Sequence, residues 1–292
     1  MAHTDVAAHA RRKLRLFLGL TVVLVGLSYI PVIQAGKLDA LGGLAVYLVM
    51  WAPGVAAMLT QLITERRLSG LGWRPRTWQL LGLALVLPAI YGTVVYLPVW
   101  GSGLAGFDPA GWSKSVGGIA PLKALGMLLT VGVLISLTSA LGEEIGWRGL
   151  LVPELAKLGS FQYVAVVSGL IWTLYHVPLI VFADYRGVGT PVWYSLLCFF
   201  PMVMAIAVVM AWLRLKSDSL WPPALLHASH NLIIQSVFDS ATRHGPWSGY
   251  LTGEFGIGLV LAIGACAWVL CKRGGVPVTE AERWGNLVIR AA

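Results

Sequence analysis

Long apolar runs separated by short polar connections occupy most of this chain. A run of about 20 apolar residues is long enough for a helix to cross a hydrocarbon core about 30 Å thick. Such runs cover residues 16–35, 41–63, 80–99, 122–151, 163–182, 192–213, 220–238 and 251–270. The pattern therefore predicts an all-α polytopic membrane protein with about eight transmembrane helices.

The composition agrees with this interpretation. Hydrophobic residues make up 57% of the chain, charged residues make up only 12%, and the mean hydropathy is +0.76. These values lie outside the range of ordinary soluble domains. The first apolar run is longer than a signal-peptide core and no convincing cleavage site follows it, so we interpret it as a retained anchor. With no internal repeat and no long linker, residues 1–292 are predicted to form a single integral membrane domain.

The basic residues fall mainly on one side of the predicted membrane. Sixteen of the 21 Lys and Arg residues lie in alternate connections and at the two chain ends. Five lie on the other side, and they are Lys37, Lys114, Lys123, Arg186 and Arg243. Because basic residues of short loops are retained in the cytoplasm, both termini are predicted to be cytoplasmic. The net charge of +8 is spread over short loops, which excludes a basic domain that binds nucleic acid.

A pair of carboxylates interrupts the fourth apolar run. Glu143 and Glu144 are followed by Arg148, four residues after the second carboxylate. On a helix Glu144 and Arg148 share a face and can form an ion pair, whereas Glu143 is rotated by about 100°. Ionisable groups inside a membrane are costly and usually mark a functional site. Glu143 is thus a candidate general base, although both carboxylates could instead bridge helices.

Two further polar clusters lie in later apolar runs. His176 follows Trp172 by one helical turn, and His227 and Asn231 are also one turn apart. His and Asn side chains can donate hydrogen bonds to the oxyanion of acyl transfer. The alternative is that these groups only form hydrogen bonds between helices, and we expect that structural role for His230.

Position along the predicted helices brings the clusters to similar depths. Glu143, His176 and His227 lie about eight, 13 and seven residues from the cytoplasmic ends of their helices, within the uncertainty of helix ends and tilts. The sequence therefore predicts that all three clusters meet in one cavity, and that this cavity opens toward the cytoplasm.

The three clusters together resemble the CPBP intramembrane proteases, the CAAX protease and bacteriocin-processing (Abi) family that includes the type II CAAX prenyl endopeptidases. The family is marked by E-E-x-x-x-R, F-x-x-x-H and H-x-x-x-N on successive membrane helices. The matching positions are Glu143, Glu144, Arg148, His176, His227 and Asn231. Trp172 stands where the family pattern has Phe, so an aromatic residue is kept. The resemblance covers about residues 122–238, the expected catalytic core.

The resemblance implies an intramembrane endopeptidase that hydrolyses peptide bonds of membrane-associated or lipidated substrates. Glu143 and His176 would activate the attacking water, and His227 and Asn231 would stabilise the oxyanion. The residues expected to support these side chains are Glu144, Arg148 and Trp172. The implied partners are the lipid bilayer and a membrane-associated or prenylated peptide or protein.

The chemistry of the site leaves the metal question open. Glu143, His176 and His227 are a plausible zinc set, because zinc accepts carboxylate and imidazole ligands. No H-E-x-x-H pair is present on one helix, however. The family is commonly described as metalloproteases. A mechanism that uses a glutamate and no bound metal is also proposed for it. Our interpretation favours Glu143 and His176 holding the water directly, without tightly bound zinc.

Two other functions fit the same residues. The first is a non-enzymatic immunity or scaffold protein that binds a peptide in the cavity. The second is a proton-coupled transporter, in which buried Glu and His residues are also expected. The absence of a visible inverted repeat in the sequence argues against a transporter.

Overall fold

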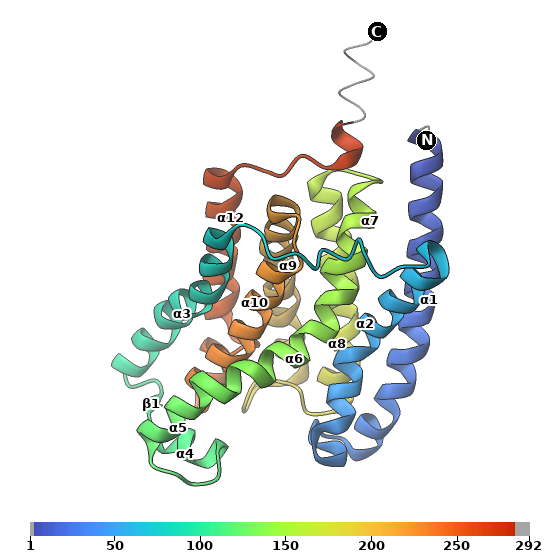
Figure 1. Cartoon of the computed structure of the whole chain (residues 1–292). Helices are drawn as coiled ribbons and strands as arrows, with labels where there is room; N and C mark the ends of the chain where they lie inside the picture. Colours follow the sequence, from blue (N-terminus) through green and yellow to red (C-terminus); the bar gives the residue numbers. More distant parts are fainter. Residues whose placement is uncertain (1–2, 284–292) are drawn as a thin grey trace.

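The computed structural model describes residues 3–283, which form a bundle of membrane-length helices (Figure 1). In chain order the helices are α1 (His3–Ala35), η1 (Ala40–Gly43), α2 (Leu44–Glu65), α3 (Trp78–Gly101), α4 (Ala110–Ser115), α5 (Pro121–Met127), η2 (Leu128–Gly132), α6 (Val133–Glu144), η3 (Ile145–Leu151), α7 (Val152–Ala156), α8 (Phe161–Phe182), α9 (Val192–Ser217), α10 (Trp221–His230), η4 (Asn231–Asp239), α11 (Ser248–Leu251) and α12 (Ile257–Gly274). Two short strands, β1 (Gly106–Phe107) and β2 (Thr242–Arg243), pair antiparallel. The prediction of an all-α polytopic membrane protein is confirmed.

Seven helices in the described part of the chain are long and apolar enough to cross a membrane, against about eight predicted. The difference concerns the predicted span 220–238. This segment is helical, as α10 followed directly by η4, and it packs against α3, α6 and α9. The polar residues that it carries, which include His227, His230, Asn231 and Gln235, make it less apolar than the other spans. Its first part, α10, is largely buried in the bundle, whereas most residues of η4 are only partly buried.

Two of the three polar clusters lie where an α-helix continues as a wider π-helix. α6 ends at Glu144, and η3 begins at the next residue. Similarly, α10 ends at His230, and η4 begins at Asn231. A π turn changes the direction of the side chains that follow it, and such turns occur frequently at functional sites. The local winding thus sets where the polar side chains point.

Helix α6 approaches α2 very closely, through glycines that flank the carboxylate pair. A Cβ added at Gly142 would lie 2.8 Å from the carbonyl oxygen of Met50, and one at Gly146 would lie 2.6 Å from Cβ of Pro53. From the other side, a Cβ at Gly54 would meet the carbonyl oxygen of Gly142. Small residues four apart allow membrane helices to pack at such short range. This contact fixes the position of the backbone that carries the carboxylates.

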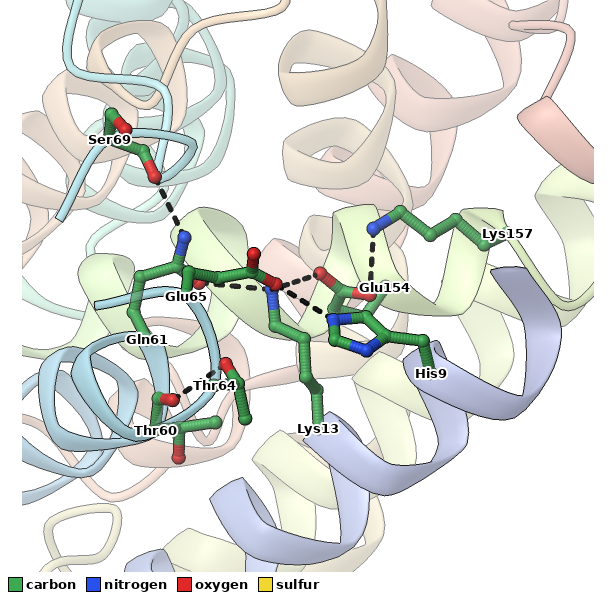
Figure 2. Close-up of polar contacts among 9 residues, drawn as sticks. All are labelled: His9, Lys13, Thr60, Gln61, Thr64, Glu65, Ser69, Glu154 and Lys157. Carbon is green, nitrogen blue, oxygen red and sulfur yellow. Dashed lines mark hydrogen bonds and ion pairs between the residues drawn. The ribbon is translucent and has the colours of Figure 1, made fainter. Parts of the chain in front are cut away.

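Helix α1 is attached to the bundle by a buried cation. Figure 2 shows Lys13 of α1 between Glu65 of α2 and Glu154 of α7. Its Nζ lies 2.8 Å from Glu154 and 3.3 Å from Glu65, and it donates to Gln61 at 3.0 Å. His9, one turn earlier, also bonds Glu65, at 2.8 Å. Removing one member of such a buried group leaves uncompensated charge, so the cluster holds α1 in register with α2 and α7.

The bundle has two faces that differ in the connections they carry. The terminal face is defined by the start of α1, the end of α12 and the connections 66–77, 157–160 and 218–220. The distal face is defined by the connections 36–43, 102–120, 183–191 and 240–256. In Figure 1 the terminal face lies at the top and the distal face, with β1, at the bottom.

Candidate active site

The three polar clusters line one cavity of about 140 Å³ in the interior of the bundle. Its walls come from α2, α6, α8, α9, α10 and η4. The residues singled out from the sequence that line it are Glu143, Trp172, His176, His227 and Asn231. The structure therefore brings together side chains from three separate membrane segments. Glu144 and Arg148 lie behind this wall.

Glu143 is held by two indole groups. Its Oε2 accepts a hydrogen bond from Nε1 of Trp172 at 2.7 Å and from Nε1 of Trp147 at 3.1 Å. Only 2% of the residue is exposed. Because both indoles bond the same oxygen, Oε1 is left for a further donor such as a water molecule. The carboxylate is thus oriented before any substrate binds.

Glu144 makes the ion pair that the spacing predicted. Nη1 of Arg148 lies 2.8 Å from Oε1 of Glu144, and both side chains are almost fully buried. The same Oε1 bonds Nδ1 of His227 at 2.9 Å. The guanidinium of Arg148 also lies over the Trp172 ring, 4.1 Å from its centroid. The sequence predicted that only Glu144 of the two carboxylates pairs with Arg148, and the structure contains this ion pair.

His176 has a defined tautomer. Its Nδ1 lies 2.8 Å from the backbone carbonyl oxygen of Trp172, one turn earlier in α8. A carbonyl only accepts hydrogen bonds, so Nδ1 carries the proton and Nε2 keeps its lone pair. The rings of Tyr175, Tyr185 and Phe199 surround the imidazole, with centroids 4.8 to 6.1 Å from its own. Nε2 is therefore able to accept a proton in an apolar setting.

The three polar residues of the third cluster differ in their contacts. His227 and Asn231 both line the cavity, and Asn231 makes no side-chain hydrogen bond within the described part of the chain. His230 is bonded on both nitrogens, through Nδ1 to the hydroxyl of Tyr91 at 2.5 Å and through Nε2 to Glu254 at 3.0 Å. Both ring nitrogens of His230 therefore have partners, whereas the Asn231 amide has none among the described residues.

One acidic residue of the cavity escaped the sequence analysis. Glu254 accepts hydrogen bonds from His230 at 3.0 Å, Gln235 at 3.1 Å and the Tyr185 hydroxyl at 2.6 Å. Burial by itself raises the pKa of this carboxyl, but the hydrogen bonds and the charge of His230 outweigh it and lower the pKa to about 2. Glu254 lies in the connection 252–256, outside every motif. The only feature of the sequence that could have indicated it is an isolated acidic residue between glycines.

The structure gives no support to a zinc centre. Among residues 3–283, no three His, Cys, Asp or Glu residues are grouped so that they could hold a metal ion. Glu143, His176 and His227, the set considered from the sequence, do not form such a group. We therefore do not propose a metal site here.

The cavity extends from Glu143 toward the distal face. Its outermost lining residues are Leu38, Tyr185 and Glu254, all in connections of that face. On the other side of Glu143 the same helical segment continues to Ala156 at the terminal face.

A layer of buried side chains separates Glu143 from the terminal face. Trp147, Leu150 and Leu151 are at most 2% exposed, and Arg148 is fully buried. The cavity and the chain termini therefore belong to opposite faces of the bundle. Cytoplasmic termini, and a cavity that opens toward the cytoplasm, both expected from the sequence, stay predictions.

Comparison with known proteins agrees with the motifs. Residues 125–233 match the family model described as Type II CAAX prenyl endopeptidase Rce1-like. A relative named CAAX prenyl protease 2, from Methanococcus maripaludis, is 31% identical over 84 residues. The alignment covers 28% of this chain and 31% of the relative, so the chain spans about a third of the relative's length. These matches confirm the family resemblance for the segment that carries the three motifs.

Proposed function

We propose that this chain, which carries the type II CAAX prenyl endopeptidase core over residues 125–233, is an intramembrane endopeptidase. It would hydrolyse peptide bonds of membrane-associated or lipidated substrates. The observation that carries this proposal is the shared cavity in which the oriented Glu143 carboxylate and the His176 imidazole lie with His227 and Asn231. The relative from Methanococcus maripaludis is named a CAAX prenyl protease, which supports lipidated CAAX-type peptides as one substrate class.

The first chemical step is attack by water on the scissile carbonyl carbon. Oε1 of Glu143 and Nε2 of His176 hold the water, and one of them takes its proton as the new C–O bond forms. The tetrahedral intermediate then collapses, the C–N bond breaks, and the proton passes to the leaving amine. The products are a carboxylic acid and an amine, so one water is consumed per bond cut.

The negative charge that develops on the carbonyl oxygen must be stabilised by hydrogen-bond donors. The Asn231 amide can donate from Nδ2, which has no other partner in the described residues. His227 has Nδ1 bonded to Glu144, so its Nε2 can donate only when the ring is protonated. Glu144 stabilises that imidazolium. Donors aimed at a developing oxyanion typically contribute about 10²–10³ in rate each.

The apolar surroundings contribute to the same step. The cavity is lined by aliphatic and aromatic side chains on α2, α8 and α9, including Val49, Leu179, Met202, Val203 and Ile206. Water-poor surroundings strengthen the interactions between the charged groups and the reacting atoms. They also accommodate the apolar side chains or lipid of a membrane-bound peptide.

The test is mass spectrometry of peptides incubated with the purified protein in detergent. Wild type, Glu143→Gln and the exposed control Glu280→Gln are each given farnesylated CaaX peptides and membrane-anchored peptides, with and without chelator. We expect cleavage by wild type and by the control, and a loss of about 10²–10⁴-fold in Glu143→Gln. The chelator arm reports whether a divalent cation takes part.

Two outcomes would contradict the proposal. Equal cleavage by wild type and Glu143→Gln would remove Glu143 from the reaction. Failure of folded wild type to cut any peptide in the panel would favour a non-enzymatic immunity or scaffold protein that binds a peptide in the cavity.

A further inference from the structure

We infer that a basic cavity at the terminal face binds a phosphate group, which is carried by the headgroup of an anionic phospholipid. This site is separate from the cavity at Glu143, with which it shares no lining residue. Four features of the molecule support it: the charge of the cavity wall, a buried arginine with a free donor, the fixed connection that covers the cavity, and its depth in the membrane.

The basic cavity lies between the connection 66–77 and the end of α9, and its volume is about 320 Å³. Three arginines line it, Arg74, Arg76 and Arg214, together with a single acidic residue, Asp218. Three guanidinium groups and one carboxylate leave the wall with two positive charges. Guanidinium groups bind phosphate oxygens through pairs of parallel N–H bonds. The wall therefore suits an anion with several oxygens.

Arg214 is buried but keeps one donor free. Only 5% of its side chain is exposed. Its Nε donates to the backbone carbonyl oxygen of Arg148 at 2.8 Å, and its Nη1 lies 3.2 Å from Oδ1 of Asp218. These two bonds fix the guanidinium, and Nη2 has no hydrogen-bond partner among residues 3–283. An arginine that only kept the connection in the cytoplasm could remain in water. Because burial of an unpaired polar group is costly, the free Nη2 indicates a ligand.

Gly72 leaves space in front of this donor. Its φ of +82° lies in the left-handed region that favours glycine. A Cβ added here would lie 3.1 Å from Nη2 of Arg214 and 2.9 Å from the backbone nitrogen of Leu220. The absence of a side chain thus allows the connection to approach the guanidinium and keeps Nη2 open to the cavity.

Hydrogen bonds hold the connection 66–77 in place over the cavity. Nε2 of Gln61 donates to the backbone carbonyl oxygen of Ser69 at 2.7 Å (Figure 2). Nε1 of Trp221 donates to the backbone carbonyl oxygen of Trp73 at 2.6 Å. A wall that is already fixed loses little conformational entropy when a ligand binds. The cavity is therefore a built site, and its arginines are not merely a flexible charged loop.

The cavity lies at the depth of lipid headgroups. The connection joins the end of α2 at Glu65 to the start of α3 at Trp78, and α9 ends beside it at Ser217. All three helices are long and apolar enough to cross a membrane. Trp78 is 77% exposed, and tryptophan is enriched at the boundary between membrane and water.

The charge of the connection favours a lipid of the cytoplasmic leaflet. Residues 66–77 include four arginines and no acidic residue, which predicts a cytoplasmic position. Anionic lipids give that leaflet its negative surface potential, and basic pockets between membrane helices bind their headgroups. A phosphate group attached to acyl chains is concentrated at this depth, whereas free phosphate is not. The headgroup is therefore the favoured source of the phosphate.

The test is a titration of the full-length protein in detergent, followed by native mass spectrometry. The probes are phosphatidylglycerol, phosphatidylcholine and inorganic phosphate. We expect a single tightly bound phosphatidylglycerol and weaker binding of phosphatidylcholine, because its choline cation would lie close to the arginines. Inorganic phosphate at the same concentration should not displace the lipid, since it has no acyl chains to contact the helices.

Three variants locate the binding. Arg74→Gln changes an exposed residue of the cavity wall, so folding should not change, and we expect the affinity for phosphatidylglycerol to fall by about 5-fold. Arg214→Gln removes the buried donor and should reduce the affinity by about 10–100-fold. Arg67→Gln is the matched control, because it removes the same charge from the same connection but lies outside the cavity wall. It should bind like wild type.

Several results would overturn the inference. Equal affinities of wild type, Arg74→Gln and Arg214→Gln would remove the site, and if Arg214→Gln does not fold, Arg74→Gln alone decides. A loss in Arg67→Gln as large as in Arg74→Gln would mean that surface charge, and not the cavity, attracts the lipid. Equal affinity for the two lipids would contradict an anionic headgroup, and displacement by equimolar inorganic phosphate would contradict a lipid source. None of these measurements involves peptide cleavage, so their failure is distinguishable from failure of the proposed endopeptidase function.

Discussion

His227 and Glu144 are joined by a hydrogen bond of 2.9 Å between Nδ1 of the imidazole and Oε1 of the carboxylate. The same oxygen accepts from Nη1 of Arg148 at 2.8 Å. Because an ionised carboxylate only accepts, Nδ1 carries a proton, and the charge of a protonated His227 would be balanced by Glu144. Glu144 therefore connects the buried guanidinium to the side chain that we propose as an oxyanion donor.

Substitution of the two neighbouring glutamates is expected to have different effects on stability. Glu144→Gln leaves the buried Arg148 without its counter-ion, which costs about 3–5 kcal/mol of folding free energy. Glu143→Gln removes a carboxylate that forms no ion pair with the described residues, so stability should change little. Thermal unfolding followed by tryptophan fluorescence, combined with peptide cleavage, measures both properties. We expect activity to fall in both variants and the Tm to fall only in Glu144→Gln.

A double substitution provides the control for this difference. Glu144→Gln combined with Arg148→Met removes both charges, and it should recover part of the Tm lost in Glu144→Gln. Activity should remain low, because His227 still lacks its carboxylate partner. A double variant no more stable than Glu144→Gln would show that the ion pair is not the cause.

Trp172 is expected to contribute to the reaction through its indole N–H. Trp172→Phe restores the aromatic residue of the family pattern but removes the 2.7 Å hydrogen bond to Glu143. Hydrogen bonds to charged groups contribute about 1.5–3 kcal/mol, which corresponds to roughly 10–100-fold in rate. The measurement is kcat and KM on one cleaved peptide, and we expect kcat to fall by this factor.

An exposed tryptophan on another helix gives the matched control for Trp172. Trp193 of α9 is exposed and lies outside the cavity wall, so Trp193→Phe should leave kcat unchanged. If Trp172→Phe were as active as Trp193→Phe, the orientation of Glu143 by the indole would have no role in catalysis.

The helices and the Glu144–Arg148 ion pair followed from the sequence because both depend on local patterns. Apolar runs of membrane length predicted the spans, and the four-residue spacing of Glu144 and Arg148 predicted their ion pair. The same spacing separated Glu143 from the pair. These features depend on helix geometry alone, and the structure contains them.

Other features depended on contacts between distant segments. The changes from α-helix to π-helix at Ile145 and at Asn231 are not marked by any periodic pattern of apolar residues in the sequence. Glu254 reaches the cavity only because the connection before α12 folds back over η4. The direction in which the cavity extends depends on the packing of η3 and α7 between Glu143 and the terminal face. The composition of the chain does not indicate how tight this packing is.

Glycine at position 142 is required by the approach of α6 to α2. In Gly142→Ala the new methyl group would lie 2.8 Å from backbone atoms of Met50 and Trp51. Backbone cannot move aside as a side chain does, so we expect about 1–3 kcal/mol of destabilisation and a displaced Glu143. Gly126→Ala on the same membrane segment is the matched control, since no atom lies within 4 Å of its added Cβ. Equal Tm and cleavage rates for the two variants would contradict the close packing.

Glu254 is expected to make stability depend on pH in the acidic range. Burial raises the pKa of its carboxyl, but hydrogen bonds from His230, Tyr185 and Gln235 prevail and lower it from 4.5 to about 2. A lowered carboxyl pKa means that the folded state favours the ionised form. Its contribution is therefore complete above about pH 4.5 and is lost as the pH falls through about 2. A difference of this size corresponds to a free energy on the order of 3 kcal/mol.

Unfolding of wild type and Glu254→Gln, measured in detergent between about pH 7 and about pH 2, separates this contribution from the others. At neutral pH the variant should have the lower Tm, because the amide cannot accept all three hydrogen bonds as an anion does. As the pH falls below about 4.5, the wild-type Tm should decrease toward that of the variant. Glu280→Gln, which changes an exposed carboxylate, should follow wild type throughout. Parallel curves for wild type and Glu254→Gln would show that ionised Glu254 does not hold the distal connections together.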